Sequence, residues 1–162
     1  RDTPLAVQVL DAPAQWTRMD FVSDLHLRED DEATFEALAQ HLAQTPAQAV
    51  FILGDLFDVW VGDDVLQEDG FEARCARALR QASAQRALYF VCGNRDFLLG
   101  AAFLHASGMQ GLNEPVLLRW RKERLLLAHG DALCLGDTAY LNFRAKVRGP
   151  VWQRSFLAQT LA

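Results

Sequence analysis

The sequence has few cysteines, and their arrangement excludes two kinds of small-protein scaffold. Three cysteines are scattered over 162 residues, and no two of them stand in a Cys-x-x-Cys spacing. An odd number of widely separated cysteines does not suit a disulfide framework or a zinc knuckle. We therefore interpret Cys75, Cys92 and Cys134 as small buried hydrophobic residues in a protein of a reducing compartment.

Long apolar runs and an excess of positive charge are also absent. No apolar stretch of the sequence approaches the roughly 20 residues that a membrane-spanning helix needs. Lysine and arginine number 16 against 21 aspartates and glutamates, which gives a net charge of −5. This balance offers no electrostatic basis for nonspecific nucleic-acid binding. The hydrophobic fraction of 51% and the charged fraction of 23% predict a folded domain rather than a disordered chain.

Short apolar runs alternate with amphipathic segments along the chain. The runs are continuous, which is typical of strands buried on both faces of a parallel sheet. The segments between them are rich in the residues that favour helices. The pattern therefore predicts an α/β fold, layered around one main sheet. Predicted strands cover Asp20–Val22, Ala49–Leu53, Ala87–Cys92, Val116–Trp120 and Leu125–Ala128, the last two as a hairpin, and predicted helices cover Ala33–Ala43, Phe71–Ala84, Phe97–Ala106, Thr138–Val147 and Val151–Leu161.

Four of the predicted strands are followed by side chains that commonly bind metal ions. The first strand leads into Asp24 and His26, the second into Asp55, the third into Asn94, and the last into His129. In open α/β sheets ligands bind beyond the carboxyl ends of the strands, so these four loops should converge. Carboxylate, amide and imidazole ligands without thiolate suit Mn²⁺, Fe or Zn²⁺ better than Ca²⁺. We therefore predict a two-metal site with Asp55 between the ions.

The strings around these residues make the sequence similar to a known superfamily. Asp-x-His, Gly-Asp, Gly-Asn and His-Gly, in this order, resemble the calcineurin-like metallophosphoesterases. The longer strings SDLHL, GDLFDVWVGDD, GNRDFLLG and HGDALCLGDTAY resemble the bacterial UDP-2,3-diacylglucosamine pyrophosphohydrolases of lipid A synthesis. The resemblance runs from about Phe21 to Tyr140. It implies a metallophosphoesterase fold, a β-sheet sandwich flanked by helices, with a helical lid-like insertion that begins near Asp137.

The resemblance also implies a reaction and a cellular location. The implied reaction is hydrolysis of the diphosphate of UDP-2,3-diacylglucosamine to UMP and 2,3-diacylglucosamine 1-phosphate, with two Mn²⁺ ions as cofactors. The lipid-nucleotide substrate implies a peripheral enzyme on the cytoplasmic face of the inner membrane. Nucleic acid is not an expected partner.

The family pattern assigns a role to each residue of the predicted site. In that pattern Asp24 and His26 bind one ion, Asn94 and His129 bind the other, and Asp55 lies between them. The substrate contacts that the resemblance implies are Asn94, Arg95, Asp137 and Tyr140.

Arg95 departs from the wider superfamily, in which a histidine commonly follows the asparagine and can protonate a leaving alkoxide. Arginine stays charged at neutral pH and cannot act as a general acid. An enzyme with arginine here should prefer a leaving group that needs no proton, such as a sugar 1-phosphate, whose second pKa is about 6. We therefore predict that Arg95 is a catalytic residue that binds the diphosphate oxygens. The alternative is a surface ion pair with Asp96 or Asp137.

Two features leave alternatives open. The apolar face of Trp152, Phe156 and Leu157 fits core packing or an exposed surface for an acyl chain or a membrane. The residues that follow Asp55 in the family-like string either shape the surroundings of the metal site or form an ordinary loop. These residues are Trp60, Asp63 and Asp64.

The superfamily usually has two further metal-binding histidines in a late Gly-His-x-His loop. No histidine follows His129, so we expect a natural chain that continues beyond Ala162. We expect residues 1–18, before Met19, to be an N-terminal extension, and residues 19–162 to be a catalytic domain that is incomplete at its C-terminus. The alternatives for function are another phosphoesterase of nucleotides or phosphodiesters, and a non-catalytic homologue.

Overall fold

The computed structural model describes residues 6–66 and 69–159, which form two β-sheets and a set of helices. Two short 3-10 helices, η1 (Asp63–Val65) and η2 (Asp131–Leu133), lie in loops. The strands are β1 (Gln8–Asp11), β2 (Met19–Val22), β3 (Ala49–Leu53), β4 (Ala87–Val91), β5 (Gln110–Leu112), β6 (Val116–Trp120) and β7 (Glu123–Leu127). The α-helices are α1 (Glu32–Gln44), α2 (Phe71–Ser83), α3 (Ala101–Ser107), α4 (Thr138–Val147) and α5 (Pro150–Leu157).

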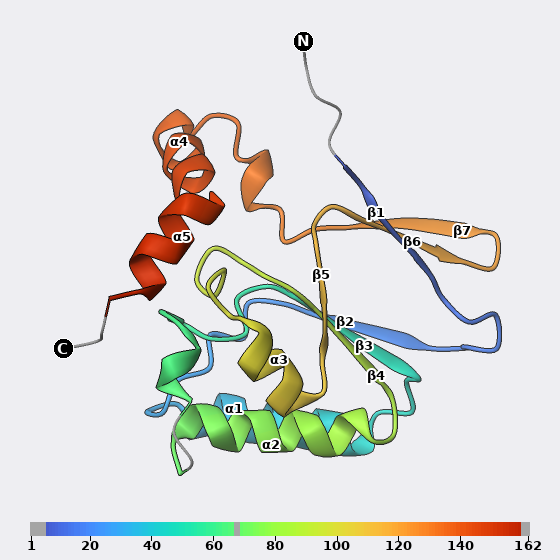
Figure 1. The fold of residues 1–162 in the computed structure, drawn as a ribbon. Coiled ribbons are helices and arrows are strands. Elements are labelled where there is room, and N and C mark those ends of the chain that lie inside the picture. The colour runs from blue at the N-terminus through green and yellow to red at the C-terminus, as the bar shows by residue number, and fades with distance from the viewer. Residues whose placement is uncertain (1–5, 67–68, 160–162) are drawn as a thin grey trace.

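The elements are arranged in three layers. Four parallel strands form the first sheet in the order β2-β3-β4-β5, and α1 and α2 lie side by side along one of its faces (Figure 1). The second sheet has the order β1-β6-β7 and lies on the other side of the first sheet. The layers are therefore helices, parallel sheet and small mixed sheet, which agrees with the expected sandwich flanked by helices.

The alternating side chains of β3 explain why its sequence is apolar throughout. Val50 and Ile52 belong to the core between the parallel sheet and the helices. Ala49 and Phe51 belong to the core between the two sheets, where Phe51 stacks on Tyr89 of β4 with ring centroids 4.7 Å apart. A strand covered on both faces needs apolar residues at every position.

The predicted hairpin of Val116–Trp120 with Leu125–Ala128 is confirmed, but the prediction that Leu125–Ala128 is buried on both faces is wrong. This segment lies in β7, which pairs antiparallel with β6 at the edge of the second sheet. Leu126 is 68% exposed, and Leu125 is also exposed. An edge strand of the outer sheet is covered on one face at most. A run of leucines in such a strand therefore does not mean that both of its faces are buried.

Two strands were not predicted, and one of them lies in the expected N-terminal extension. Strand β1 pairs in parallel with β6, with Gln8 opposite Val116. Part of the segment before Met19 therefore belongs to the fold, while the boundary at residue 18 stays a prediction. Strand β5 also went unpredicted because its three residues, which include Gly111, give no apolar run.

The predicted helix Phe97–Ala106 begins later in the structure, at Ala101. The reason is Asp63, whose carboxylate accepts the N–H groups of Gly100, Ala102 and Phe103 at 2.9–3.2 Å. The same carboxylate accepts the indole N–H of Trp60, which is buried in the helix-side core. Asp63 and Trp60 thus hold the start of α3, which favours their role in the loop over a role in the metal site.

Helices α4 and α5 begin where the lid-like insertion was expected. Asp137 is the N-cap of α4, because its carboxylate accepts the N–H of Tyr140 at 2.9 Å. Helix α5 ends at Leu157, four residues before the predicted end, which itself lies outside the described residues. Its Trp152 and Phe156 stack at 4.9 Å and pack against the core, which favours core packing for these two side chains.

The cysteines only partly match their interpretation as buried residues. All three are free thiols. Cys75 is buried, and burial raises its pKa to about 12. Cys134 is exposed on the loop before α4, so for it the interpretation is wrong. No helix among residues 6–66 and 69–159 is long and apolar enough to cross a bilayer.

Candidate metal centre

The carboxyl ends of neighbouring strands bring the predicted ligands to one place. In the parallel sheet Val22 of β2 is in register with Ile52 of β3, and Leu53 is in register with Val91 of β4. The three strands therefore end side by side, and the loops that follow them carry the ligand residues. The structure brings together all five predicted ligands, Asp24, His26, Asp55, Asn94 and His129.

One half of the site is formed by Asp24, His26 and Asp55. Their ligand atoms all lie within 4.8 Å of one another. His26 Nε2 is 3.9 Å from Asp24 Oδ1 and 3.7 Å from Asp55 Oδ2. His26 Nδ1 lies 3.0 Å from the carboxylate of Asp58, so it carries the proton and leaves the Nε2 lone pair free for a metal. A β-bridge joins the backbones of Leu27 and Phe57. Because His26 and Asp58 are their neighbours in the sequence, the bridge brings the side chains of His26 and Asp58 together.

The other half is formed by Asn94 and His129. His129 Nδ1 lies 2.8 Å from the carbonyl oxygen of Leu53, so this nitrogen donates and the Nε2 lone pair is again free. His129 Nε2 faces Asn94 Oδ1 at 2.9 Å and Asp55 Oδ2 at 3.7 Å. Both halves therefore present metal-binding atoms toward the carboxylate of Asp55.

One carboxylate oxygen of Asp55 bonds to the backbone, and the other faces both halves of the site. Its Oδ1 accepts the N–H of Arg95 at 2.8 Å. Its Oδ2 lies 3.7 Å from Nε2 of both His26 and His129. Asp55 is buried, and its position between the two imidazoles is the one expected of a bridging carboxylate.

Asp96 is a completely buried carboxylate that holds the loops around Asp55. It accepts the N–H groups of Gly93 at 2.8 Å, Leu56 at 2.7 Å and Asp55 at 3.3 Å. Burial raises the pKa of Asp96, and the N–H groups of Gly93 and Leu56 oppose that rise. Its contacts join the loops after β3 and β4 and leave no role for it as an ion-pair partner of Arg95.

The ligand loops adopt backbone conformations that most residues avoid. Asp24, His26 and Asp55 have φ values of 54°, 48° and 53°, in the left-handed region. Gly54, with φ of 91°, has no room for a side chain, because a Cβ there would lie 2.5 Å from His129 Nδ1. A Cβ on Gly93 would lie 2.0 Å from Asp55 Oδ1. Glycine is therefore required where the second and third loops approach each other.

The donor set fits divalent metal ions. Two neighbouring ligands of one ion, each at about 2.1 Å and at right angles, stand about 3 Å apart, as the Nε2 of His129 and the Oδ1 of Asn94 do. These two atoms both carry lone pairs that face each other, and a cation between them relieves that repulsion. The oxygen and nitrogen donors suit Mn²⁺, Fe or Zn²⁺.

Asp58 was not predicted as part of the site, although it lies in the string GDLFD. Replacing Asp58 with alanine removes the partner that fixes the His26 ring. We expect the affinity for the ion bound by Asp24 and His26 to fall by about 10- to 100-fold, because such hydrogen bonds orient metal-binding histidines. Titration of the metal-free protein with Mn²⁺ measures this. Asp30→Ala, on an exposed carboxylate that pairs with Arg28, is the control and should leave the affinity unchanged.

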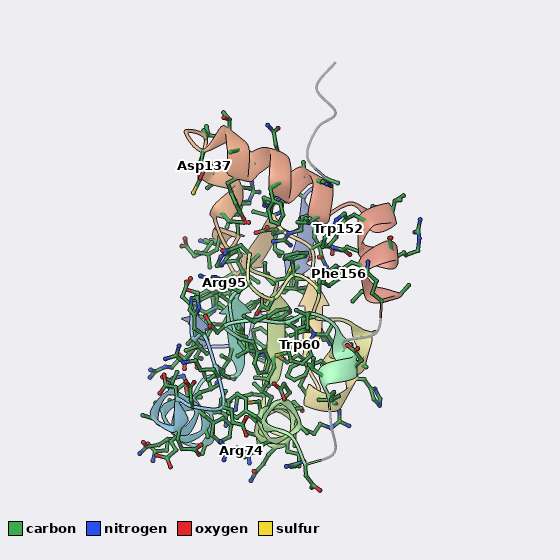
Figure 2. The ribbon with its side chains drawn as sticks, turned by 90° about the vertical axis from the view of Figure 1, so that its left-hand side faces the viewer. Trp60, Arg74, Arg95, Asp137, Trp152 and Phe156 are labelled. Carbon is green, nitrogen blue, oxygen red and sulfur yellow. The ribbon has the colours of Figure 1, made fainter. Side chains whose placement is uncertain are left out.

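Arg95 lies at the sheet end, between the strands and helix α4 (Figure 2). Its backbone contacts Asp55 and Trp60, while its side chain is exposed and forms no hydrogen bond or ion pair with another described residue. The alternative of a surface ion pair with Asp96 or Asp137 is therefore not realised. The exposed guanidinium is available to a ligand.

The predicted substrate contacts Asp137 and Tyr140 have contacts of their own in the structure. Asp137 caps the helix, and the Tyr140 hydroxyl donates to Asp131, two residues after His129. Burial raises the pKa of Asp131, but hydrogen bonds from Arg144 and Tyr140 outweigh burial and hold the pKa below its ordinary value. Sequence reasoning missed the charged residues that join α4 to the site together with Asp131, namely Glu114, Arg144 and Arg148.

Several known proteins are similar in sequence to most of this chain. The chain is 46% identical over 144 residues to the UDP-2,3-diacylglucosamine hydrolase of Chromobacterium violaceum, across 88% of this chain and 60% of that protein. It is 43% identical to the protein of the same name from Serratia proteamaculans and 44% identical to that from Bordetella pertussis, across 87% and 86% of this chain and 59% and 55% of theirs. The chain thus spans less than two thirds of the length of these relatives.

The family comparison covers most of the chain. Residues 17–155 match the family described as calcineurin-like phosphoesterase, and this range includes all five predicted ligands and Arg95. The chain therefore belongs to the calcineurin-like phosphoesterase family.

Proposed function

We propose that the protein hydrolyses the diphosphate of UDP-2,3-diacylglucosamine to UMP and 2,3-diacylglucosamine 1-phosphate, with two Mn²⁺ ions as cofactors. The observation that carries the proposal is the single free oxygen of Asp55 at 3.7 Å from two imidazoles whose other nitrogens are already occupied. The relatives named UDP-2,3-diacylglucosamine hydrolase support the substrate. The nitrogen and oxygen donors support Mn²⁺.

The residues of the site have separate tasks in this reaction. Asp24 and His26 would hold one ion, Asn94 and His129 the other, and Asp55 both. Bound ions lower the pKa of water and stabilise negative charge on phosphoryl oxygens. The five residues would hold the ions beside the diphosphate, where bound metal would activate a water for attack at the α-phosphorus.

Arg95 suits a diphosphate better than an ordinary phosphodiester. Its exposed guanidinium can bind two oxygens of the diphosphate and neutralise the charge that develops on them. Arginine supplies no proton, and a leaving phosphate monoester with a second pKa of about 6 needs none. Asn94, Asp137 and Tyr140 are further proposed substrate contacts.

Five large apolar side chains between η2 and the end of α5 are exposed, which supports contact with a lipid substrate at the inner membrane. Exposed apolar side chains of this size can bury themselves against acyl chains. We propose that the protein binds the cytoplasmic face of the inner membrane peripherally through these side chains. They are Leu133, Leu135, Phe143, Val151 and Leu157.

Hydrolysis in ¹⁸O-labelled water tests the proposed reaction. We expect the full-length protein with Mn²⁺ to convert UDP-2,3-diacylglucosamine in detergent micelles to equal amounts of UMP and lipid monophosphate. Attack at the α-phosphorus places the label in UMP, as mass spectrometry would show. Label in the lipid phosphate would contradict the proposed direction of attack. Faster turnover of soluble nucleotides or simple phosphodiesters would favour another phosphoesterase, and no turnover with any divalent metal would indicate a non-catalytic homologue.

A further inference from the structure

Four charged side chains form a mostly buried cluster between α4 and the metal centre. Arg144 Nε donates to Asp131 Oδ2 at 2.8 Å, and its Nη2 donates to Glu114 Oε1. Arg148 Nη2 is 3.7 Å from Asp131 Oδ2. The side chains are between 6% and 21% exposed, so water screens them little. Two carboxylates and two guanidiniums balance each other, and removing one leaves a mostly buried charge without its partner.

Glu114 extends this cluster to the metal ligand His129. While its Oε1 accepts from Arg144, its Oε2 accepts the backbone N–H of His129 at 2.9 Å. Asp131, the second partner of Arg144, follows His129 by two residues. Arg144 therefore holds the His129 loop at two points. One is Glu114, which accepts the His129 N–H, and the other is Asp131, two residues after His129.

Arg148, one turn further along α4, makes similar contacts with the segment that carries Asn94. Its Nη2 donates to the carbonyl oxygen of Gly93 at 2.8 Å, and its Nη1 lies 2.7 Å from Cys92 Sγ. Neither arginine contacts Asp24 or His26 in the described part of the chain. The contacts of α4 thus reach one half of the metal centre and not the other.

We propose that Arg144 is a positioning residue that, through Glu114, holds His129 and with it the ion site formed by Asn94 and His129. This inference rests on the proposed two-metal function. The helix that carries the proposed substrate contact Tyr140 is then coupled to one ion site: the ion is bound well when α4 is docked, and loosening α4 weakens that ion and not its neighbour.

Titration with Mn²⁺ alone, followed by the electron paramagnetic resonance signal of free Mn²⁺, tests this coupling in the full-length protein. The unmodified protein should bind two ions. Arg144→Ala should weaken one of them by about 10- to 100-fold, the usual effect of losing a partner that orients a metal ligand, and leave the other unchanged. Arg144→Lys, which keeps the charge but not the forked geometry, should restore part of the affinity. Lys146→Ala, on an exposed cation of the same helix, is the matched control and should change neither ion.

Two further variants identify the affected half. In an Asp24→Ala background the ion site of Asn94 and His129 is left alone, and adding Arg144→Ala should weaken the remaining ion by the same roughly 10- to 100-fold. Glu114→Gln retains an acceptor for the His129 N–H but loses the charge that Arg144 requires. If Arg144→Ala does not fold, Glu114→Gln takes its place in the titration and should weaken the same ion.

Equal weakening of both ions, or no change in either, would overturn the positioning role. The first result would mean that the cluster only fastens α4 to the domain. Failure of the unmodified protein to bind Mn²⁺ would instead overturn the proposed function itself.

Discussion

Replacement of Asp55 by alanine is expected to remove both metal ions and to lower the rate of hydrolysis by about 10³-fold or more. The reason is geometric: Asp55 Oδ2 lies 3.7 Å from the free nitrogens of both His26 and His129. Removal of this oxygen deprives each half of a ligand and leaves the two histidines without the charge between them. Elemental analysis of the purified variant measures the metal content, and release of UMP measures the rate.

Two variants separate the loss of metal from a loss of folding. Asp55→Asn retains an oxygen that can accept the Arg95 N–H, so the loops should remain in place while the bridging charge is lost. Asp24→Ala should empty one site and leave the ion of Asn94 and His129 partly bound. Full activity of the unmodified protein in excess chelator would exclude a two-metal mechanism.

Replacement of Arg95 by alanine should lower the rate with the lipid diphosphate by on the order of 10²-fold, comparable to the loss of one preorganised transition-state donor. Within the described residues the guanidinium forms no hydrogen bond or ion pair, and its charge acts only at a distance on Asp58, whose pKa His26 and, after it, Arg95 lower, so its removal should leave the fold intact. The rate constant and the thermal unfolding midpoint together test this, with an unchanged midpoint expected.

Replacement of Arg95 by histidine should change selectivity rather than only rate. Histidine can donate a proton to an alkoxide leaving group, so turnover of such esters should rise relative to the diphosphate. Arg95→Lys keeps the charge but loses the fork and should lie between the parent and alanine. An Arg95→Ala variant that hydrolyses the lipid diphosphate at the parent rate would show that Arg95 has no catalytic role.

The sequence predicted the convergence of the ligands because that convergence follows from local rules. Each ligand follows an apolar run, and parallel strands in register end at the same edge of their sheet. The positions of Asp24, Asp55 and Asn94 therefore needed no knowledge of packing. His129 also reached this edge although β7 belongs to the second sheet, because the hairpin directs its end toward the same loops.

The partners of the ligands could not be predicted in this way. Asp58 pairs with a histidine 32 residues earlier, and Glu114 accepts from the backbone of a residue 15 positions later. Arg144 joins two carboxylates from different loops. No periodic pattern connects such pairs, because tertiary packing alone decides which charged residues meet. The same is true of β1, whose four residues become a strand by pairing with β6.

The left-handed backbone of Asp24, His26 and Asp55 has a consequence for how this protein can evolve. Each residue with a Cβ in this conformation destabilises the folded state by roughly 1–2 kcal/mol, and aspartate lies at the lower end of this range. Relief of this backbone strain alone would favour glycine at all three positions, and each replacement would delete a metal-binding side chain. The loops after β2 and β3 are thus positions where a more stable protein is a less active one, and stabilising changes must accumulate elsewhere in the chain.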